Sequence, residues 1–370
     1  MNRISTQLTM PDRVRLDLIT PEDDNRPVFV AGNFTNWFPD VEQFRMNSVK
    51  PGHYRLELPR AMLPDVLEYK YTRGGWDAVE LNESGEAPPN RITRRKAGKK
   101  RDFVPHWRSF GRPFNPDFLP QLVQIDPEFA TPTLGSPRQI RVLIPYNYQQ
   151  TDRRYPVLYM QDGQNLIGAG SGYGSWAIDQ KLAILAARNR HEVIVVAIDH
   201  GETSRIGEFT TEQTMAGTGR GQQYLDFLAN HLKPLIDSRF RSLSDAENTG
   251  IGGSSLGGLI SLSGGLHYPD VFGRLLVFSP SLWIAPNVYD EAQRYRPNQK
   301  AKIYLFGGTK ESRYMAAGLN HLRDAFRRRW TLLNSNIDVC VSILPDGRHQ
   351  EVYWGREFPR AFEWLFYPDK

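Results

Sequence analysis

The stretch 250–260, GIGGSSLGGLI, places two adjacent serines between pairs of glycines. The letters GSSLG at 253–257 match the pattern G-x-S-x-G, in which the central serine sits on a sharp turn from strand to helix and attacks a carbonyl carbon. The pattern selects Ser255, which has glycine two positions away on both sides, whereas Ser254 has it only at Gly252. A plain tight turn and a Gly-rich phosphate cradle are the other interpretations of this stretch.

A serine nucleophile needs a general base nearby. Among the eight histidines, His349 follows the apolar run VCVSIL and a Pro-Asp-Gly turn, and it precedes a helical pattern. The loop after the last strand is where a hydrolase histidine can reach the nucleophile, so we predict His349 as the base. His200 also ends a predicted strand and is a candidate to line the site.

The base needs an acid that orients its ring, and two acids precede His349. Glu311 follows the run AKIYLFGGTK, at the end of the strand before the last one. Asp346 is the rival, but it shares a loop with His349 and is only three residues away. An acid from an adjacent strand end holds the far ring nitrogen more readily, so Glu311 is the preferred candidate.

Backbone amides are the expected stabilisers of a developing oxyanion. Leu256 opens the helix after the serine, so its N–H can point at the reacting oxygen. The second donor comes from the loop after an earlier strand, and VLYMQDGQN places the amide of Gln164 just after a permissive glycine. Asp162 in this loop is expected to tie the loop down rather than to react.

The elements that must position these residues follow an alternating pattern. From about residue 120, continuous apolar runs alternate with helical spacing, as in YPVLYM, EVIVVAI and LLVFS against GQQYLDFLANHLKPLIDSRF. Such runs fit strands covered on both faces, and the alternation predicts a mostly parallel, doubly wound α/β sheet.

The first hundred residues have a different composition. GHYRLELP and LEYKYTRG alternate apolar and polar residues, and RPVFVAGNF is a further strand candidate closed by Gly32 and Asn33. Short strands between Gly, Pro and Asn turns predict a small all-β sandwich over 1–100. RITRRKAGKKR at 91–101 is strongly basic and lacks interleaved aromatics, so we expect a solvated, flexible linker and no nucleic-acid site. Residues 101–118 are expected to be a crossing segment, followed by the α/β domain at 119–370.

Composition excludes several classes of site. The chain of 370 residues has one cysteine, Cys340, so an intrachain disulfide and a cysteine-based metal site are excluded. No apolar run is long enough to span a membrane, and the first residues have no apolar segment of a secretory signal. We therefore expect a cytoplasmic location, no membrane partner, and no metal or cofactor. The oligomeric state stays open.

The larger domain resembles the esterase group of α/β-hydrolases, which includes enterobactin-type esterases, S-formylglutathione hydrolase, feruloyl esterases and mycolyltransferases. The resemblance rests on YPVLYMQDGQNL, AIDHG, RIGEFT, GSSLGGL, FSPSLW, IYLFGGTKE and GRHQEVYW, in this order. It implies an α/β-hydrolase fold and the same roles for Ser255, His349 and Glu311, with an oxyanion hole of the Gln164 and Leu256 amides. Gln161 departs from the histidine that related esterases often carry at that position.

The N-terminal domain is similar to starch- and glycogen-binding modules, through VFVAGNFTNWFPD, GHYRLELP and LEYKYTRGGWDAVELNESGEAPPNRI. The resemblance implies an α-glucan as partner, with Trp37 and Trp76 stacking on sugar rings and Asn90 and Lys70 bonding their hydroxyls. Two other interpretations stay open, in which the two tryptophans pack the sandwich core or face the esterase domain.

Together these patterns predict a serine carboxylic ester hydrolase that acts on a small-molecule ester, of the sugar-linked or siderophore-like kind. Two alternatives remain at this point. One is an acyltransferase that uses the same three residues and passes the acyl group to an alcohol. The other is a glucan-binding protein with an inert hydrolase domain.

Overall fold

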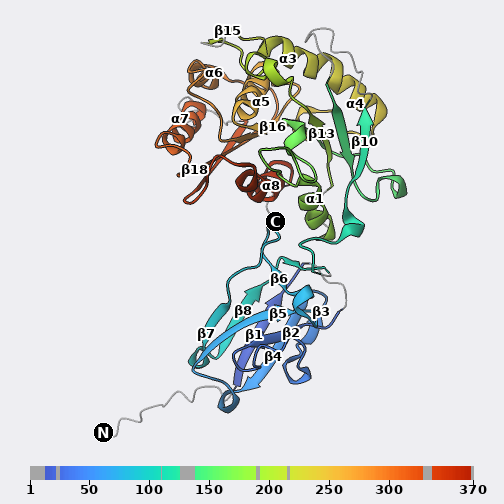
Figure 1. Cartoon of the computed structure of the whole chain (residues 1–370), viewed down its shortest axis with the longest axis vertical. Coiled ribbons are helices and arrows are strands. Elements are labelled where there is room, and N and C mark those ends of the chain that lie inside the picture. Colours follow the sequence, from blue (N-terminus) through green and yellow to red (C-terminus); the bar gives the residue numbers. More distant parts are fainter. Residues whose placement is uncertain are drawn as a thin grey trace. The chain divides into compact units, whose positions relative to one another are not determined.

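The computed structural model describes residues 13–21, 26–109, 111–125, 138–188, 192–214, 217–327 and 336–367. The chain divides into two compact units, coloured in chain order in Figure 1. One comprises Met1–Pro116 with Ala183–Arg190, and the other comprises Asp117–Leu182 with His191–Lys370.

The second unit is built on an eight-stranded sheet. In sheet order its strands are β10 (Gln121–Ile125), β11 (Ile140–Ile144), β13 (Ile194–Ile198), β12 (Val157–Gln161), β16 (Thr249–Ser254), β17 (Arg274–Phe278), β18 (Ala301–Gly308) and β19 (Ile337–Leu344). The pairs β10–β11 and β11–β13 are antiparallel, and every pair from β13 to β19 is parallel. The predicted mostly parallel α/β sheet is thus confirmed, and β10 is a strand that the sequence patterns missed.

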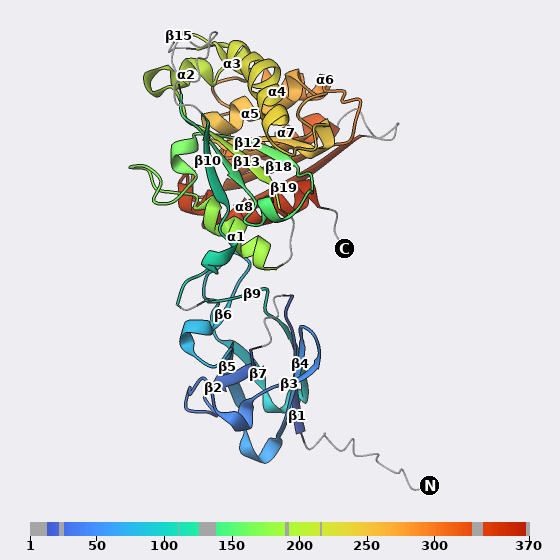
Figure 2. The ribbon, with the colours of Figure 1, turned by 90° about the vertical axis from the view of Figure 1, so that its right-hand side faces the viewer.

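Helices cover both faces of this sheet. They are α1 (Ile178–Ala187), α2 (Arg205–Glu208), α3 (Gly221–Phe227), α4 (Lys233–Arg239), α5 (Leu256–His267), α6 (Val288–Arg294), α7 (Met315–Arg327) and α8 (Glu351–Phe366), with a π-helical turn at Leu228–Leu232 between α3 and α4 and a short hairpin of β14 (Gln213–Thr214) and β15 (Gly217–Thr218). Figure 2 shows α1 and α8 on one side of the sheet and α3, α4 and α5 on the other.

Burial explains why the central strands read as unbroken apolar runs. All residues of β12, β13, β16 and β17 are buried, because helices pack on both faces of the sheet. Because β12 to β19 run parallel, their carboxyl ends share one edge of the sheet, where ligand sites of such folds form. The segments that leave this edge carry every predicted catalytic residue.

The first unit is rich in strands. One sheet has the order β3 (Asn47–Lys50), β4 (His53–Pro59), β1 (Arg13–Ile19), β8 (Lys99–Phe103), a second has β2 (Phe29–Gly32), β5 (Val66–Thr72), β7 (Arg91–Arg94), and β6 (Glu80–Leu81) pairs with β9 (His106–Trp107). Leu16 and Leu56 from the first sheet and Val30 and Tyr69 from the second belong to one buried core. In β4 and β5 the alternation in the sequence reflects one buried face and one more exposed face.

The basic stretch 91–101 corrects one expectation. It is not a flexible linker, because it forms β7, a 3-10 turn and most of β8. The charge of Arg91 is balanced, since its guanidinium lies 2.6 Å from Glu80 and 3.2 Å from Asp102. The basic segment can therefore form strands, because the buried carboxylates of Glu80 and Asp102 neutralise the charge of Arg91.

The predicted crossing segment 101–118 is also partly wrong. Its first part completes β8, which pairs in parallel with β1, and β9 follows. Trp107 is buried in the core of the first unit, and its Nε1 donates a hydrogen bond of 3.0 Å to Thr20 Oγ1. The large apolar surface of Trp107 is buried in the core of the first unit, and this explains why the unit extends past residue 100.

Candidate active site

Ser255 occupies the turn between β16 and α5 with φ 58° and ψ −121°. This backbone conformation is unusual for a residue with a side chain, and it places the serine hydroxyl at the carboxyl edge of the sheet. The end of β17 and the loop after it hold the turn on both sides of Ser255. Ser255 N donates to Phe278 O at 3.0 Å, and Ser255 O accepts from Ser281 N at 3.1 Å.

The glycines on both sides of the serine give the turn its clearance. A Cβ on Gly253 would lie 2.9 Å from the carbonyl carbon of Gly257. A Cβ on Gly257 would lie 2.9 Å from Asp162 Oδ2 and 3.1 Å from Gln161 Cβ. Strand and helix backbones therefore meet too closely for any side chain at either position, as expected for a strand-to-helix elbow.

Glu311 and His349 lie together in the fold. Glu311 Oε2 is 2.9 Å from His349 Nδ1, and the glutamate side chain is only 2% exposed. An ionised carboxylate can only accept, so Nδ1 carries the hydrogen and Nε2 keeps a free lone pair. This is the tautomer in which His349 can take a proton from a hydroxyl.

The other carboxylate oxygen of Glu311 is held as well. Glu311 Oε1 accepts hydrogen bonds from Ser279 Oγ at 2.7 Å and from Gly308 N at 2.5 Å. Trp354 Nε1 in turn donates to Ser279 Oγ at 2.8 Å, and the Trp354 ring meets the His349 ring edge-on at 5.0 Å. The acid and the histidine are therefore fixed by two side chains, Ser279 and Trp354, and by the backbone N–H of Gly308.

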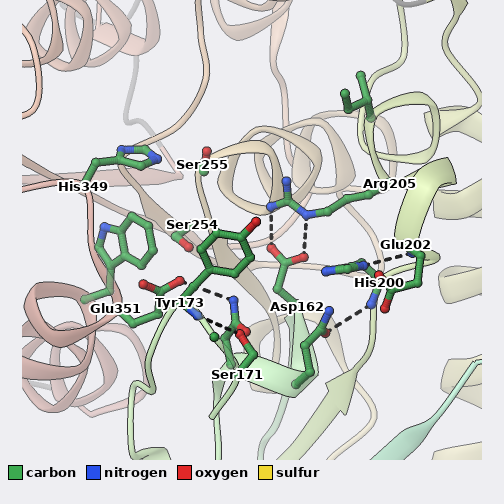
Figure 3. Close-up of a pocket in the computed structure, with 15 residues that line it drawn as sticks. Asp162, Ser171, Tyr173, His200, Glu202, Arg205, Ser254, Ser255, His349 and Glu351 are labelled. Carbon is green, nitrogen blue, oxygen red and sulfur yellow. Dashed lines mark hydrogen bonds and ion pairs between the residues drawn. The ribbon is translucent and has the colours of Figure 1, made fainter.

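The serine hydroxyl and His349 border the same pocket, which Figure 3 shows with both side chains labelled. Ser255 Oγ lies 3.3 Å from Ser281 Oγ, and within the described residues no hydrogen bond joins it to His349. Catalytic hydrogen bonds are often long in unliganded sites and shorten when substrate binds. The arrangement suits a resting enzyme in which Ser281 holds the hydroxyl.

The candidate oxyanion donors also reach this region. Leu256 is the first residue of α5, directly after Ser255, and Gln164 sits in a 3-10 turn after β12 and lines the pocket. Gln164 Oε1 accepts a hydrogen bond of 3.3 Å from His200 N, which ties the turn to the loop after β13.

Asp162 anchors the floor of the pocket. It adopts φ 56°, and its two oxygens each accept a 2.7 Å hydrogen bond from Arg205, a bidentate ion pair visible in Figure 3. The carboxylate raises the pKa of the Arg205 guanidinium, against the effect of burial. The geometry fits the expectation that Asp162 ties down its loop.

The pocket has a volume of about 600 Å³. It is lined by Asp162, Gln164, Asn165, Ser171, Gly172, Tyr173, His200, Glu202, Arg205, Ile206, Ser254, Ser255, His349, Glu351 and Trp354. Arg205 and Glu351 are charged lining residues that the sequence analysis missed. Both residues follow the ends of strands, which is the one sequence signal for a place in the pocket. The sequence does not distinguish them from other charged residues in loops.

The remaining predicted neighbours fall outside the pocket lining. Asp346 is exposed in the turn after β19, whereas Glu311 makes the contact with His349. Gln161 is buried beneath the elbow, and its Oε1 accepts a hydrogen bond from Tyr224 OH. Gln161 therefore supports the turn from below.

The residues of the predicted sugar site lie in the first unit. Trp37 and Trp76 have ring centroids 6.4 Å apart at 39°, and Trp76 is 40% exposed. Neither ring belongs to the buried core of this unit. Lys70 donates to the carbonyl of Pro88, and Asn90 is exposed just before β7. The structure brings the two tryptophans together but engages Lys70 elsewhere.

The described ranges contain neither a candidate metal site nor a candidate membrane-spanning helix. No group of three or more His, Cys, Asp or Glu side chains there could hold a metal ion. In the same ranges, every helix is too short or too polar to cross a membrane. Cys340, on β19, is half-buried and forms no disulfide.

Comparisons with known proteins found similar sequences and similar solved structures. The protein YbbA of Bacillus subtilis is 24% identical over 246 residues, covering 62% of this chain and 92% of that protein. The crystal structure of the BES protein from Bacillus cereus matches with a TM-score of 0.54 and 18% identity, over 67% of this chain and 95% of that one.

A third match extends over both units. The crystal structure of the enterobactin esterase FES from Shigella flexneri in the presence of enterobactin matches with a TM-score of 0.52 and 15% identity, over 96% of this chain and 92% of that one. The family model described as "Putative esterase" matches residues 131–365, which is more than half of the chain. The protein therefore belongs to this esterase family and is an ester-hydrolysing enzyme with an α/β-hydrolase fold.

Proposed function

We propose that the protein is a serine carboxylic ester hydrolase that works through an acyl-enzyme on Ser255, with His349 as base and Glu311 as orienting acid. The observation that carries this proposal is the 2.9 Å hydrogen bond between Glu311 and His349 beside a pocket that also contains Ser255. Ser255 and His349 line one pocket, Glu311 contacts His349, and the three residues follow separate strands in the chain order Ser, Glu, His.

In the proposed reaction, His349 Nε2 takes the proton of Ser255 Oγ as the oxygen attacks the ester carbonyl. Glu311 stabilises the imidazolium, and the amides of Leu256 and Gln164 bind the oxyanion, each contributing about 3 kcal/mol by analogy with measured donors. His349 then protonates the leaving alcohol, and water cleaves the acyl-enzyme by the same route. For the first step, Ser255 Oγ must turn from Ser281 toward His349.

We further propose that the substrates are small-molecule esters, of the sugar-linked or siderophore-like kind. The adjacent tryptophans of the first unit, Trp37 half-buried and Trp76 exposed, support the sugar-linked kind. The likeness to the enterobactin esterase supports the other kind. A carbohydrate-binding protein with an inert hydrolase domain is less consistent with a histidine held in its active tautomer.

The two serines of the elbow provide the first test. Ser255→Ala removes the nucleophile, so we expect loss of p-nitrophenyl ester turnover by about 10⁴-fold or more with an unchanged thermal midpoint. Ser254→Ala is the matched control and should keep labelling by a fluorophosphonate, read by mass spectrometry at Ser255. If Ser254→Ala abolished turnover while Ser255→Ala stayed near the wild-type rate, the assignment would be wrong.

The choice of acid provides the second test. Glu311→Gln puts an amide N–H against His349 Nδ1 and favours the wrong tautomer, so kcat should fall about 10³- to 10⁴-fold. Asp346→Asn changes an exposed acid in the neighbouring turn and should leave kcat within about twofold of the wild-type value. Steady-state kinetics on one p-nitrophenyl ester measure both. A large loss in Asp346→Asn with a small one in Glu311→Gln would identify Asp346 as the acid.

We propose a second function for the first unit, which is binding of an α-glucan through Trp37 and Trp76. Affinity electrophoresis of the whole protein in a gel containing glycogen should show retardation that Trp76→Ala removes. Trp283→Ala is the control, because Trp283 is an exposed tryptophan of the other unit. A wild-type protein that migrates equally with and without glycogen would refute glucan binding and leave the hydrolase assignment untouched.

A further inference from the structure

Glu351 is a nearly buried carboxylate that the proposed mechanism does not use. It opens α8 two residues after His349, is 8% exposed, and lines the active-site pocket. Its only described side-chain partner is Asn165, whose Nδ2 lies 3.3 Å from Glu351 Oε1. Among the described residues, no cation forms an ion pair with Glu351, so its charge is available to a ligand.

The pocket walls have an excess of negative charge. Arg205 is the lining guanidinium, and its bidentate pairing with Asp162 cancels one carboxylate. Glu202 is a further lining acid, and within the described part of the chain it has no ion-pair partner either. Exposed cations on neighbouring loops, such as Arg348, do not belong to the lining.

Next to Glu351, the pocket also contains a hydrogen-bond acceptor that receives no hydrogen bond, the side-chain oxygen of Asn165. Asn165 must turn its Nδ2 toward the carboxylate, because a carboxylate cannot donate a hydrogen bond. This orientation leaves Asn165 Oδ1 buried with no hydrogen-bond partner. A buried acceptor without a partner carries a free-energy cost that a ligand donor would remove.

We propose that Glu351, together with Asn165, is a specificity-determining pair that binds a hydroxyl or ammonium group of the ester substrate, and that the pocket rejects anionic esters. The inference rests on the proposed function, because the same pocket must hold the ester. It favours a hydroxyl-bearing, sugar-linked ester over an ester with carboxylate or other anionic arms. Hydroxyl and ammonium share the donor chemistry, and the test separates them.

The burial of Glu351 supports this assignment. Burial raises the pKa of the Glu351 carboxyl above its ordinary value, and the Asp162 charge raises it further, against the effects of His349 and Arg205. An ammonium group bound beside the carboxylate would supply the missing countercharge and lower that pKa.

The experiment compares esters that differ only in one terminal group. One series varies the acyl chain of p-nitrophenyl hexanoates, ending in methyl, hydroxyl, ammonium or carboxylate. The other varies the alcohol of butyrate esters, with protonated N,N-dimethylaminoethanol, which has one N–H donor, its uncharged isostere 3-methylbutanol, and 3-hydroxypropionate, followed by pH-stat. In at least one series, kcat/KM should be about fivefold or more higher for the donor-bearing ester than for the anionic ester, as expected for a charge in a partly exposed pocket.

Variants separate Glu351 from the general charge of the protein. Glu351→Gln should shrink the ratio of cationic to anionic kcat/KM at least threefold, an effect of the size expected for one neutralised charge. Asp290→Asn is the control, since it removes one exposed charge on α6 outside the pocket lining and should preserve the ratio.

Three outcomes would count against the inference. An anionic ester cleaved as well as the donor-bearing one in both series overturns it, and so does an unchanged ratio in Glu351→Gln. Neither result affects the hydrolase assignment, which is read from the neutral esters. If no neutral ester is cleaved, the proposed function itself fails and this inference fails with it.

Discussion

The backbone strain at Ser255 is the constraint on which the rest of the site depends. A residue held at φ 58° and ψ −121° carries a conformational cost on the order of 1–3 kcal/mol, which the surrounding structure must offset. Gly253 and Gly257 permit the turn, and hydrogen bonds with the last residue of β17 and with the loop after it hold the turn at Ser255 N and O. The serine hydroxyl is therefore presented at a fixed point above the sheet, and other groups need only reach that point.

The loop after β17 links both ends of the proposed triad. Ser281 contacts the hydroxyl of Ser255, and Ser279 donates to the carboxylate of Glu311. One short segment thus sets the resting position of the nucleophile and the position of the acid. Trp354 completes the connection from α8 by bonding Ser279 and packing against His349. Hydrogen bonds from rigid elements of this kind are what pre-organised active sites require.

Much of this arrangement could be predicted from the sequence, because strand ends are legible in it. Most of the buried parallel strands appear as apolar runs, and Glu311 and His349 each follow such a run, whereas Ser255 follows a Gly-rich buried strand. The contacts of Arg205 and Glu351 could not be predicted, because they depend on how loops from distant strands approach one another. The prediction of a flexible linker at the basic segment 91–101 was wrong for a related reason. Its partners Glu80 and Asp102 become visible only when the sheet has formed.

In the first unit, the alternation of apolar and polar residues predicted the strands but not where the unit ends. The alternating strands indicated a β-rich region, and the structure contains them. The end of that region was misplaced, because Trp107 and β8 complete its core and its sheet. Trp37 is half-buried and Trp76 is exposed, and neither belongs to the buried core, which is consistent with the proposed ligand binding.

The most direct measurement of the central claim is a crystal structure of the protein after reaction with a p-nitrophenyl alkylphosphonate, a stable mimic of the tetrahedral intermediate. The proposed mechanism predicts phosphorus bonded to Ser255 Oγ and one phosphonyl oxygen within hydrogen-bonding distance of both the Leu256 and Gln164 amides. It also predicts His349 Nε2 next to Ser255 Oγ or the leaving-group oxygen, with the Glu311 contact retained. Phosphorus on another residue, or a phosphonyl oxygen facing away from both amides, would contradict it.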